Sequence, residues 1–228
     1  MADKSHLNLI ITGHIDNGKS TTMGHFLMDL GVVDERTIAA HAKESEETGK
    51  GDTFKYAWVM DNIKDERARG ITIDLAFKKF ETPKYFFTLI DAPGHRDFVK
   101  NMITGASEAD CAVLVLSAKE GETDTAIAPG GQAREHAFLL KTLGVAQIIV
   151  AVNKMDSADY KEDAYKAVVE KGRELVKQCG YKPDNVPFIP VSGWKGDNLV
   201  KKSENLSWYS GKTLLEAFDD FTVPEKPI

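Results

Sequence analysis

Residues 13–20 read GHIDNGKS and follow an apolar run at residues 7–11. A strand, a glycine-rich turn and a helix in this order are typical of a phosphate-binding P-loop. The glycines let several backbone N–H groups turn toward phosphate oxygens, and the helix adds its positive N-terminal end. Lys19 would reach the β- and γ-phosphates, and the Ser20 hydroxyl would ligate Mg²⁺. The expected nucleotide contacts in this loop are His14, Ile15, Asp16, Asn17, Gly18, Lys19, Ser20 and Thr21.

A second box, DAPG, begins at Asp91, directly after another apolar run. An aspartate there could hold a Mg²⁺-bound water from the second shell, and the N–H of Gly94 could meet a γ-phosphate oxygen. The pattern alone also describes many turns. Thr72 is a further candidate for the metal, because a loop hydroxyl could complete the shell only when the γ-phosphate is present. The alternative is that Thr72 is an ordinary β-branched strand residue.

A third box, NKMD at residues 153–156, follows a strand-like apolar run, where the carboxyl ends of a parallel sheet form a ligand crevice. Asp156 can accept hydrogen bonds from the guanine N1–H and 2-amino groups, which adenine lacks, and losing such a bond costs roughly 2–3 kcal/mol. Asn153 would brace the loop and contact the base, and the stem of Lys154 would lie along the base plane. The alternative for this box alone is a helix-capping turn. The expected backbone donors to guanine O6 are Ser192 and Gly193, and Trp194 is a further expected nucleotide contact.

His95, beside Gly94, is the candidate for the catalytic residue. GTP hydrolysis needs a group that orients water in line with the γ-phosphate, and an imidazole can do this. The alternative is a structural histidine in a segment that begins a helix.

Short apolar runs alternate with longer helix-patterned runs, which predicts an α/β fold with a mostly parallel sheet and helices on both faces. Four residues join the second and third predicted strands, which allows only an antiparallel hairpin. Residues 34–70 form a long polar insertion without a strand pattern, and such insertions tend to be functional or mobile. Predicted strands cover residues 7–12, 72–80, 85–90, 111–117, 147–152 and 187–191, and predicted helices cover residues 18–30, 97–105, 131–142, 160–178 and 212–218.

The composition is that of a globular domain, with 42% hydrophobic and 28% charged residues among 228. No apolar run approaches the roughly 20 residues that span a bilayer, so no membrane partner is expected. The two cysteines share no metal or redox spacing, and the sequence starts without a secretory signal, which favours the cytoplasm. The net charge of −6 argues against a broad nucleic-acid footprint.

Longer strings make the chain similar to the GTP-binding (G) domain of the elongation factor 1-alpha family, the archaeal and eukaryotic counterpart of elongation factor Tu. These strings are GHIDNGKSTTMGHFL, FKYAWVMDNIKDERARGITID, DAPGHRDFVKNMITGASEADCAVLVL, NKMD and PVSGWKGDNL. The resemblance runs from residue 7 to residue 227. It implies a P-loop NTPase G domain over residues 1–222, a linker from residue 223, and two β-barrel domains outside this chain.

The resemblance also implies an activity: a Mg²⁺-dependent GTPase switch that delivers aminoacyl-tRNA to the ribosomal A site, with a guanine nucleotide exchange factor as partner and an isolated domain that is monomeric. His95 matches the family's catalytic histidine, Ile15 and Ile71 match an apolar gate, and Asp16 matches a proposed monovalent-cation ligand. Asn17 departs from the family's usual histidine, with little loss expected because its backbone would meet the phosphate. Residues 128–131 depart as well, with no assigned consequence.

Three other functions stay open. A carrier of a release or rescue factor would share every switch box, although residues 54–70 favour the tRNA carrier. A GTPase subunit of a sulfate-activating enzyme is less favoured by residues 91–102 and 190–199. A non-hydrolysing nucleotide-binding module would leave His95 structural.

Overall fold

The computed structural model describes residues 3–14, 17–32, 78–91 and 108–225. The strands are β1 (Ser5–Gly13), β2 (Lys78–Glu81), β3 (Tyr85–Asp91), β4 (Cys111–Ser117), β5 (Gln147–Asn153) and β6 (Phe188–Pro190). The helices are α1 (Lys19–Asp29), α5 (Glu122–Ile127), α6 (Gln132–Thr142), α7 (Glu162–Cys179) and α8 (Leu214–Phe218), with short 3₁₀ turns η4 (Asp156–Ala158), η5 (Pro183–Asn185) and η6 (Glu204–Leu206).

The six strands form one sheet in the order β2-β3-β1-β4-β5-β6. Among the described strands, β2 and β3 pair antiparallel, and the other neighbouring strands pair parallel. Every residue of β4 is buried, as expected for a central parallel strand covered on both faces. The α/β fold, the mostly parallel sheet and the single hairpin predicted from the sequence are confirmed.

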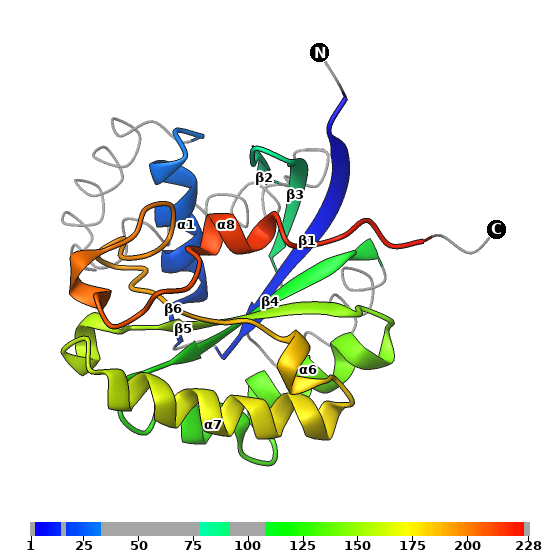
Figure 1. Cartoon of the computed structure of the whole chain (residues 1–228). Coiled ribbons are helices and arrows are strands. Elements are labelled where there is room, and N and C mark those ends of the chain that lie inside the picture. The colour runs from blue at the N-terminus through cyan, green and yellow to red at the C-terminus, as the bar shows by residue number, and fades with distance from the viewer. Residues whose placement is uncertain (1–2, 15–16, 33–77, 92–107, 226–228) are drawn as a thin grey trace, which may run out of the picture.

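Two apolar cores lie on opposite faces of the sheet. One core joins buried side chains of β1 and β3 to α1 and α8. The other joins β4 and β5 to α6 and α7. Figure 1 shows α7 and α6 below the sheet and α1 and α8 above it. Because the parallel strands end on one edge, the loops after β1, β4, β5 and β6 meet there.

The predicted elements differ from the observed ones mainly at their ends. The helix predicted from residue 160 begins at Glu162, and the helix predicted from residue 212 begins at Leu214, after a capping box made by Thr213 and Glu216. Gly144 and Gly180 adopt the positive φ expected after α6 and α7. Helix α5 was not predicted, because its six residues are too short to show a helical period. The predicted helix at 97–105 and the first part of the strand predicted from residue 72 lie outside the described residues.

Both cysteines are buried free thiols. Burial raises the pKa of the Cys111 thiol above its ordinary range and that of Cys179 to about 11, so neither is a reactive thiolate at neutral pH. Among the residues that the structure describes, no helix is long and apolar enough to cross a membrane.

Candidate nucleotide site

The P-loop joins the end of β1 to the start of α1. Gly18 stands at the N-cap of α1 with φ 76° and ψ 30°, a left-handed conformation that glycine adopts without strain. Glycine has no side chain to cap the helix, and the first turn of α1 holds no acidic residue. The N–H groups and the positive end of the helix are therefore not neutralised by the helix's own side chains, which suits a phosphate.

The predicted P-loop residues within the described range lie in the turn after β1 and in the first turn of α1. Lys19 is 5% exposed, and Ser20 and Thr21 are half-buried in the first turn of α1. The N–H of Asn17 donates to the carbonyl of His14 at 3.0 Å, which closes the turn. Ile15 and Asp16 lie outside the described residues.

The side chain of Asn17 points into the protein. It is fully buried, and its Nδ2 donates to the carbonyl of Val115 on β4 at 3.2 Å. Its Oδ1 finds no hydrogen-bond partner among the described residues. This placement agrees with the expectation that Asn17 meets a phosphate only through its backbone.

Asn153 joins the P-loop to the loop that follows β6. Its Nδ2 donates to the carbonyl of Asn17 at 2.8 Å, and its Oδ1 accepts from the N–H of Gly193 at 2.8 Å. One buried amide thus uses both of its ends to hold two loops that are far apart in the sequence. These two hydrogen bonds are of the kind that the predicted bracing role of Asn153 requires.

Asp156 and Ser192 are also in contact. The Ser192 hydroxyl donates to Oδ1 of Asp156 at 2.8 Å and accepts from the N–H of Lys195 at 3.0 Å. This hydrogen bond helps to orient the Asp156 carboxylate, and it uses Oδ1 rather than Oδ2. A carboxylate oriented in this way can accept from neighbouring N–H donors of a base.

Lys154 is held by an acidic residue that the sequence reasoning missed. Its Nζ lies 3.0 and 2.8 Å from the two carboxylate oxygens of Glu122, which also accepts from the Ser117 hydroxyl at 2.6 Å. Burial works to raise the pKa of Glu122, but the bonds from Lys154 and Ser117 outweigh it and hold that pKa below its usual range. The available signal was an acidic residue just beyond the carboxyl end of β4, on the edge where the other boxes meet.

Two histidines also support the loops, and neither was assigned a role from the sequence. His25 Nδ1 lies 2.7 Å from the carbonyl of Gly193, so its N–H donates to that carbonyl from α1. His136, on α6, accepts from the N–H of Gly13 through Nδ1 at 3.3 Å. Burial, then the charges of Lys19 and His14, lower the pKa of His136 to about 4, so it is a neutral acceptor at pH 7.

The segment at 128–131, which departs from the family pattern, lies beside the P-loop. It lines a shallow hollow of about 520 Å³ together with His14 and with Asp124 and Thr125 of α5. Gly131 is the N-cap of α6, and a Cβ at this position would overlap the carbonyl oxygen of Ala126. This segment therefore forms part of the wall next to the phosphate loop.

Two of the residues predicted to hold Mg²⁺ lie at the ends of described elements. Ser20 offers a hydroxyl at the start of α1, and Asp91 ends β3 opposite Ile11 of β1. Residues 3–14, 17–32, 78–91 and 108–225 contain no group of three His, Cys, Asp or Glu side chains that could cage a metal. Thr72, Gly94 and His95 lie outside the described residues and stay predictions.

Comparison with known proteins decides the family. A family model described as "Elongation factor Tu GTP binding domain" matches residues 4–224. The chain belongs to this family. The resemblance drawn from the sequence is thereby confirmed, and the chain is a GTPase domain of the translation-factor type.

Individual relatives agree with that family. Elongation factor 1-alpha of Cenarchaeum symbiosum is 85% identical over 228 residues, which are 100% of this chain and 52% of that protein. Elongation factor 1-alpha of Ignicoccus hospitalis is 56% identical over 224 residues, 97% of this chain and 50% of that protein. The chain thus spans about half the length of these relatives.

Solved structures share the fold. The structure of sup35 complexed with GDP superposes with a TM-score of 0.71 at 34% identity, covering 98% of this chain and 46% of that chain. The GTP-bound Ski7 GTPase-like domain of S. cerevisiae gives a TM-score of 0.72 at 25% identity, covering 94% of this chain and 49% of that one.

Proposed function

We propose that this domain binds GTP and GDP and hydrolyses GTP as a Mg²⁺-dependent switch, and that the longer protein delivers aminoacyl-tRNA to the ribosomal A site. The observation that carries the proposal is the pair of hydrogen bonds that Asn153 makes to the P-loop and to Gly193. They hold the loop after β1 and the loop after β6 close together, which supports one site for the phosphates and the base. The family and its relatives support the same function.

Guanine is the base that suits this site. Asp156 can accept from N1–H and the 2-amino group, and the N–H groups of residues 192–194 can donate to O6. Adenine offers the opposite pattern at these positions, so it would leave the carboxylate of Asp156 unpaired. The stem of Lys154, held at its end by Glu122, would cover one face of the base.

Ser20 and Thr72 would hold Mg²⁺ directly, with Asp91 acting through a bound water. When bound, Mg²⁺ would neutralise charge on the β- and γ-phosphates. His95 would orient the attacking water, and Gly94 would donate to the γ-phosphate. We further propose that Asp16 holds a monovalent cation and that an exchange factor acts on the domain. The isolated domain would be monomeric, and the protein would be cytoplasmic. Turnover without an activator should be slow, on the order of 10⁻⁴ to 10⁻² per second.

Nucleotide selectivity is the first test. Competition of GDP and ADP against a fluorescent GDP analogue should show at least a hundredfold preference for GDP, since one lost charge-assisted bond costs about 3 kcal/mol. Asp156→Asn should remove most of this preference, because an amide can present a donor to the base. Equal affinities for GDP and ADP in the unaltered chain would contradict the proposal.

Hydrolysis is the second test. Single-turnover cleavage of GTP would be followed with and without ribosomes, for the unaltered chain and for His95→Ala. Ribosome-dependent acceleration that His95→Ala abolishes, with GTP affinity unchanged, is the expected result. Unchanged hydrolysis in His95→Ala would contradict the catalytic role and favour a non-hydrolysing module. Acceleration in a termination assay but not in an elongation assay would point to a release-factor carrier.

A further inference from the structure

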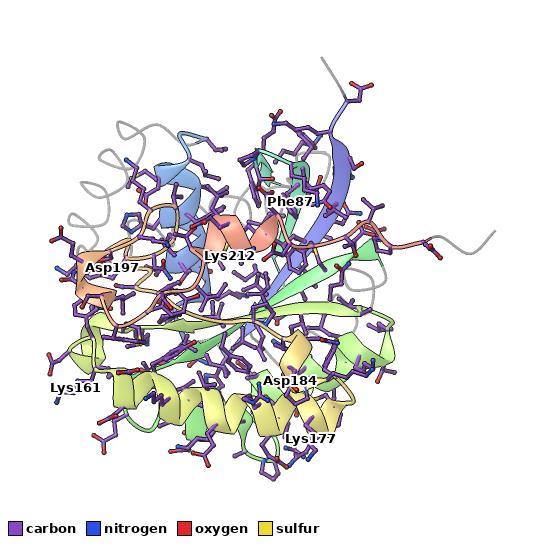
Figure 2. All side chains as sticks on the ribbon, in the orientation of Figure 1. Phe87, Lys161, Lys177, Asp184, Asp197 and Lys212 are labelled. Carbon is purple, nitrogen blue, oxygen red and sulfur yellow. The ribbon has the colours of Figure 1, made fainter. Side chains whose placement is uncertain are left out.

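The carboxylate of Asp197 joins segments of the chain that are distant in sequence. Its Oδ2 accepts from the Tyr160 hydroxyl at 2.6 Å, and its Oδ1 accepts from the Ser203 hydroxyl at 2.6 Å and from Nδ2 of Asn205 at 3.2 Å. Asp197 is 9% exposed, and it lies in the segment that follows β6 (Figure 2). A carboxylate with three donors in a nearly buried position is held in one orientation.

The backbone of Asp197 is tied directly to the base-reading loop. The N–H of Ser192 donates to the carbonyl of Asp197 at 3.1 Å, and the two residues form an isolated antiparallel bridge. The N–H of Gly196 donates back to the carbonyl of Ser192 at 2.7 Å. A shift of Asp197 would therefore move Ser192, whose hydroxyl orients Asp156.

Tyr160 is tied in the same way to the loop that carries Asp156. Its N–H donates to the carbonyl of Met155 at 2.8 Å, and its own carbonyl accepts from Nε1 of Trp208 at 2.8 Å. Its φ of 56° is a left-handed conformation that tyrosine rarely adopts. Residues in such conformations persist only where their surroundings hold them, and they gather near functional sites.

The Tyr160–Asp197 hydrogen bond thus connects the two base-reading loops through residues that would not touch the nucleotide. Burial, together with the bond to Asp197, raises the pKa of Tyr160, so the phenol keeps its proton and remains the donor. A hydroxyl bonded to a carboxylate at this length is among the stronger hydrogen bonds in proteins.

We propose that Tyr160 and Asp197 are positioning residues for guanine specificity. By fixing the spacing between Asp156 and Ser192, this pair keeps the Asp156 carboxylate aligned with both the N1–H and the 2-amino group of the base. Inosine lacks the 2-amino group, so the ratio of the GDP and IDP affinities measures that alignment. The inference rests on the proposed guanine-nucleotide binding.

The test compares two substitutions that each remove one tyrosine hydroxyl. Tyr160→Phe breaks the bond to Asp197, whereas Tyr181→Phe breaks a bond of equal length, 2.6 Å, to the carbonyl of Val145. Dissociation constants for GDP and IDP, the GDP release rate and urea unfolding would be measured for both. Tyr160→Phe should weaken GDP roughly tenfold, affect IDP less, and speed GDP release. Tyr181→Phe should lower stability without changing the GDP/IDP ratio.

A purely structural role would give a different result: both variants would lose stability, and the GDP/IDP ratio would stay at its unaltered value in each. That outcome would overturn the proposal. If Tyr160→Phe did not fold, Asp197→Asn would replace it, because a neutral amide oxygen still accepts but more weakly, and its GDP/IDP ratio should fall part of the way. An unaltered chain that does not prefer GDP over ADP would instead contradict the proposed function itself.

Discussion

At the scale of single residues, a methyl group added at Gly193 should displace the loop that follows β6. Its N–H donates to Asn153, its carbonyl accepts from His25, and a Cβ there would overlap Oγ1 of Thr22 and lie 2.8 Å from the Cα of Thr22. Because α1 is fixed by the core, the loop must move instead. Overpacking of this kind costs about 1–3 kcal/mol, so Gly193→Ala should weaken GDP binding roughly ten- to a hundredfold in a fluorescence titration.

Gly144→Ala is the matched control for Gly193→Ala. Gly144 has φ 87°, so alanine is strained there, but nothing lies within 4 Å of its Cβ and it caps α6 away from the loops. It should lose about 1 kcal/mol of stability with GDP affinity unchanged. Equal GDP affinity in the two variants would show that the contact between Gly193 and α1 does not position the loop.

At the scale of elements, α6 supports the P-loop through a histidine that must stay neutral. The pKa of His136 falls to about 4 in the folded chain against an ordinary 6.5. Between pH 4 and pH 6.5 the unfolded state therefore binds more protons than the folded state. The free energy of unfolding carries the full contribution of His136 above pH 6.5 and decreases as the pH falls toward 4. The loss attributable to His136 should reach about 3 kcal/mol. Urea unfolding at pH 7 and pH 4.5 would measure most of it.

The comparison with His136→Asn isolates this histidine from the carboxylates that also titrate in acid. An asparagine oxygen can accept from Gly13 without titrating, so the variant should lose less stability between pH 7 and pH 4.5 than the unaltered chain. His6→Asn, at an exposed position, should show the full loss. A pH dependence in His136→Asn equal to that of the unaltered chain would contradict a buried neutral acceptor.

The sequence predicted most of the described strands and helices and the positions of the motifs. It did not predict the side chains that hold the motif loops in place through hydrogen bonds. The location of Asn153, Lys154 and Asp156 at the edge of the sheet could be predicted, because they follow directly after an apolar strand. The contacts of His25 and Asp197 could not be predicted, since they depend on which loops meet at that edge, and sequence spacing does not contain that information. The position of Glu122 just beyond β4 was visible in the sequence, but its partner Lys154 was not. Helix α5 was missed for a related reason: its two buried residues, Thr123 and Ala126, form no detectable apolar stripe.

At the scale of the whole molecule, the segment after α8 ties both sides of the sheet together. The Tyr85 hydroxyl on β3 donates to the carbonyl of Phe221 at 2.6 Å, and the amide side chain of Gln147 on β5 bonds to both backbone groups of Thr222 at 2.7 Å. These contacts make residues 214–222 part of the folded domain, and Figure 1 shows this segment crossing the sheet.

Phe218 is the side chain through which this segment should matter most for stability. It is fully buried, with its ring centroid 5.3 Å from that of Phe26 on α1, 6.0 Å from that of Phe80 on β2 and 5.7 Å from that of Phe87 on β3. Phe218→Ala would leave a cavity where four elements meet and should cost about 3–5 kcal/mol in urea unfolding, with the dependence on urea concentration unchanged. Phe138→Ala, at a ring that is 37% exposed on α6, should cost under about 1 kcal/mol. If the two variants lost equal stability, α8 would be an appendage to the sheet rather than part of its core.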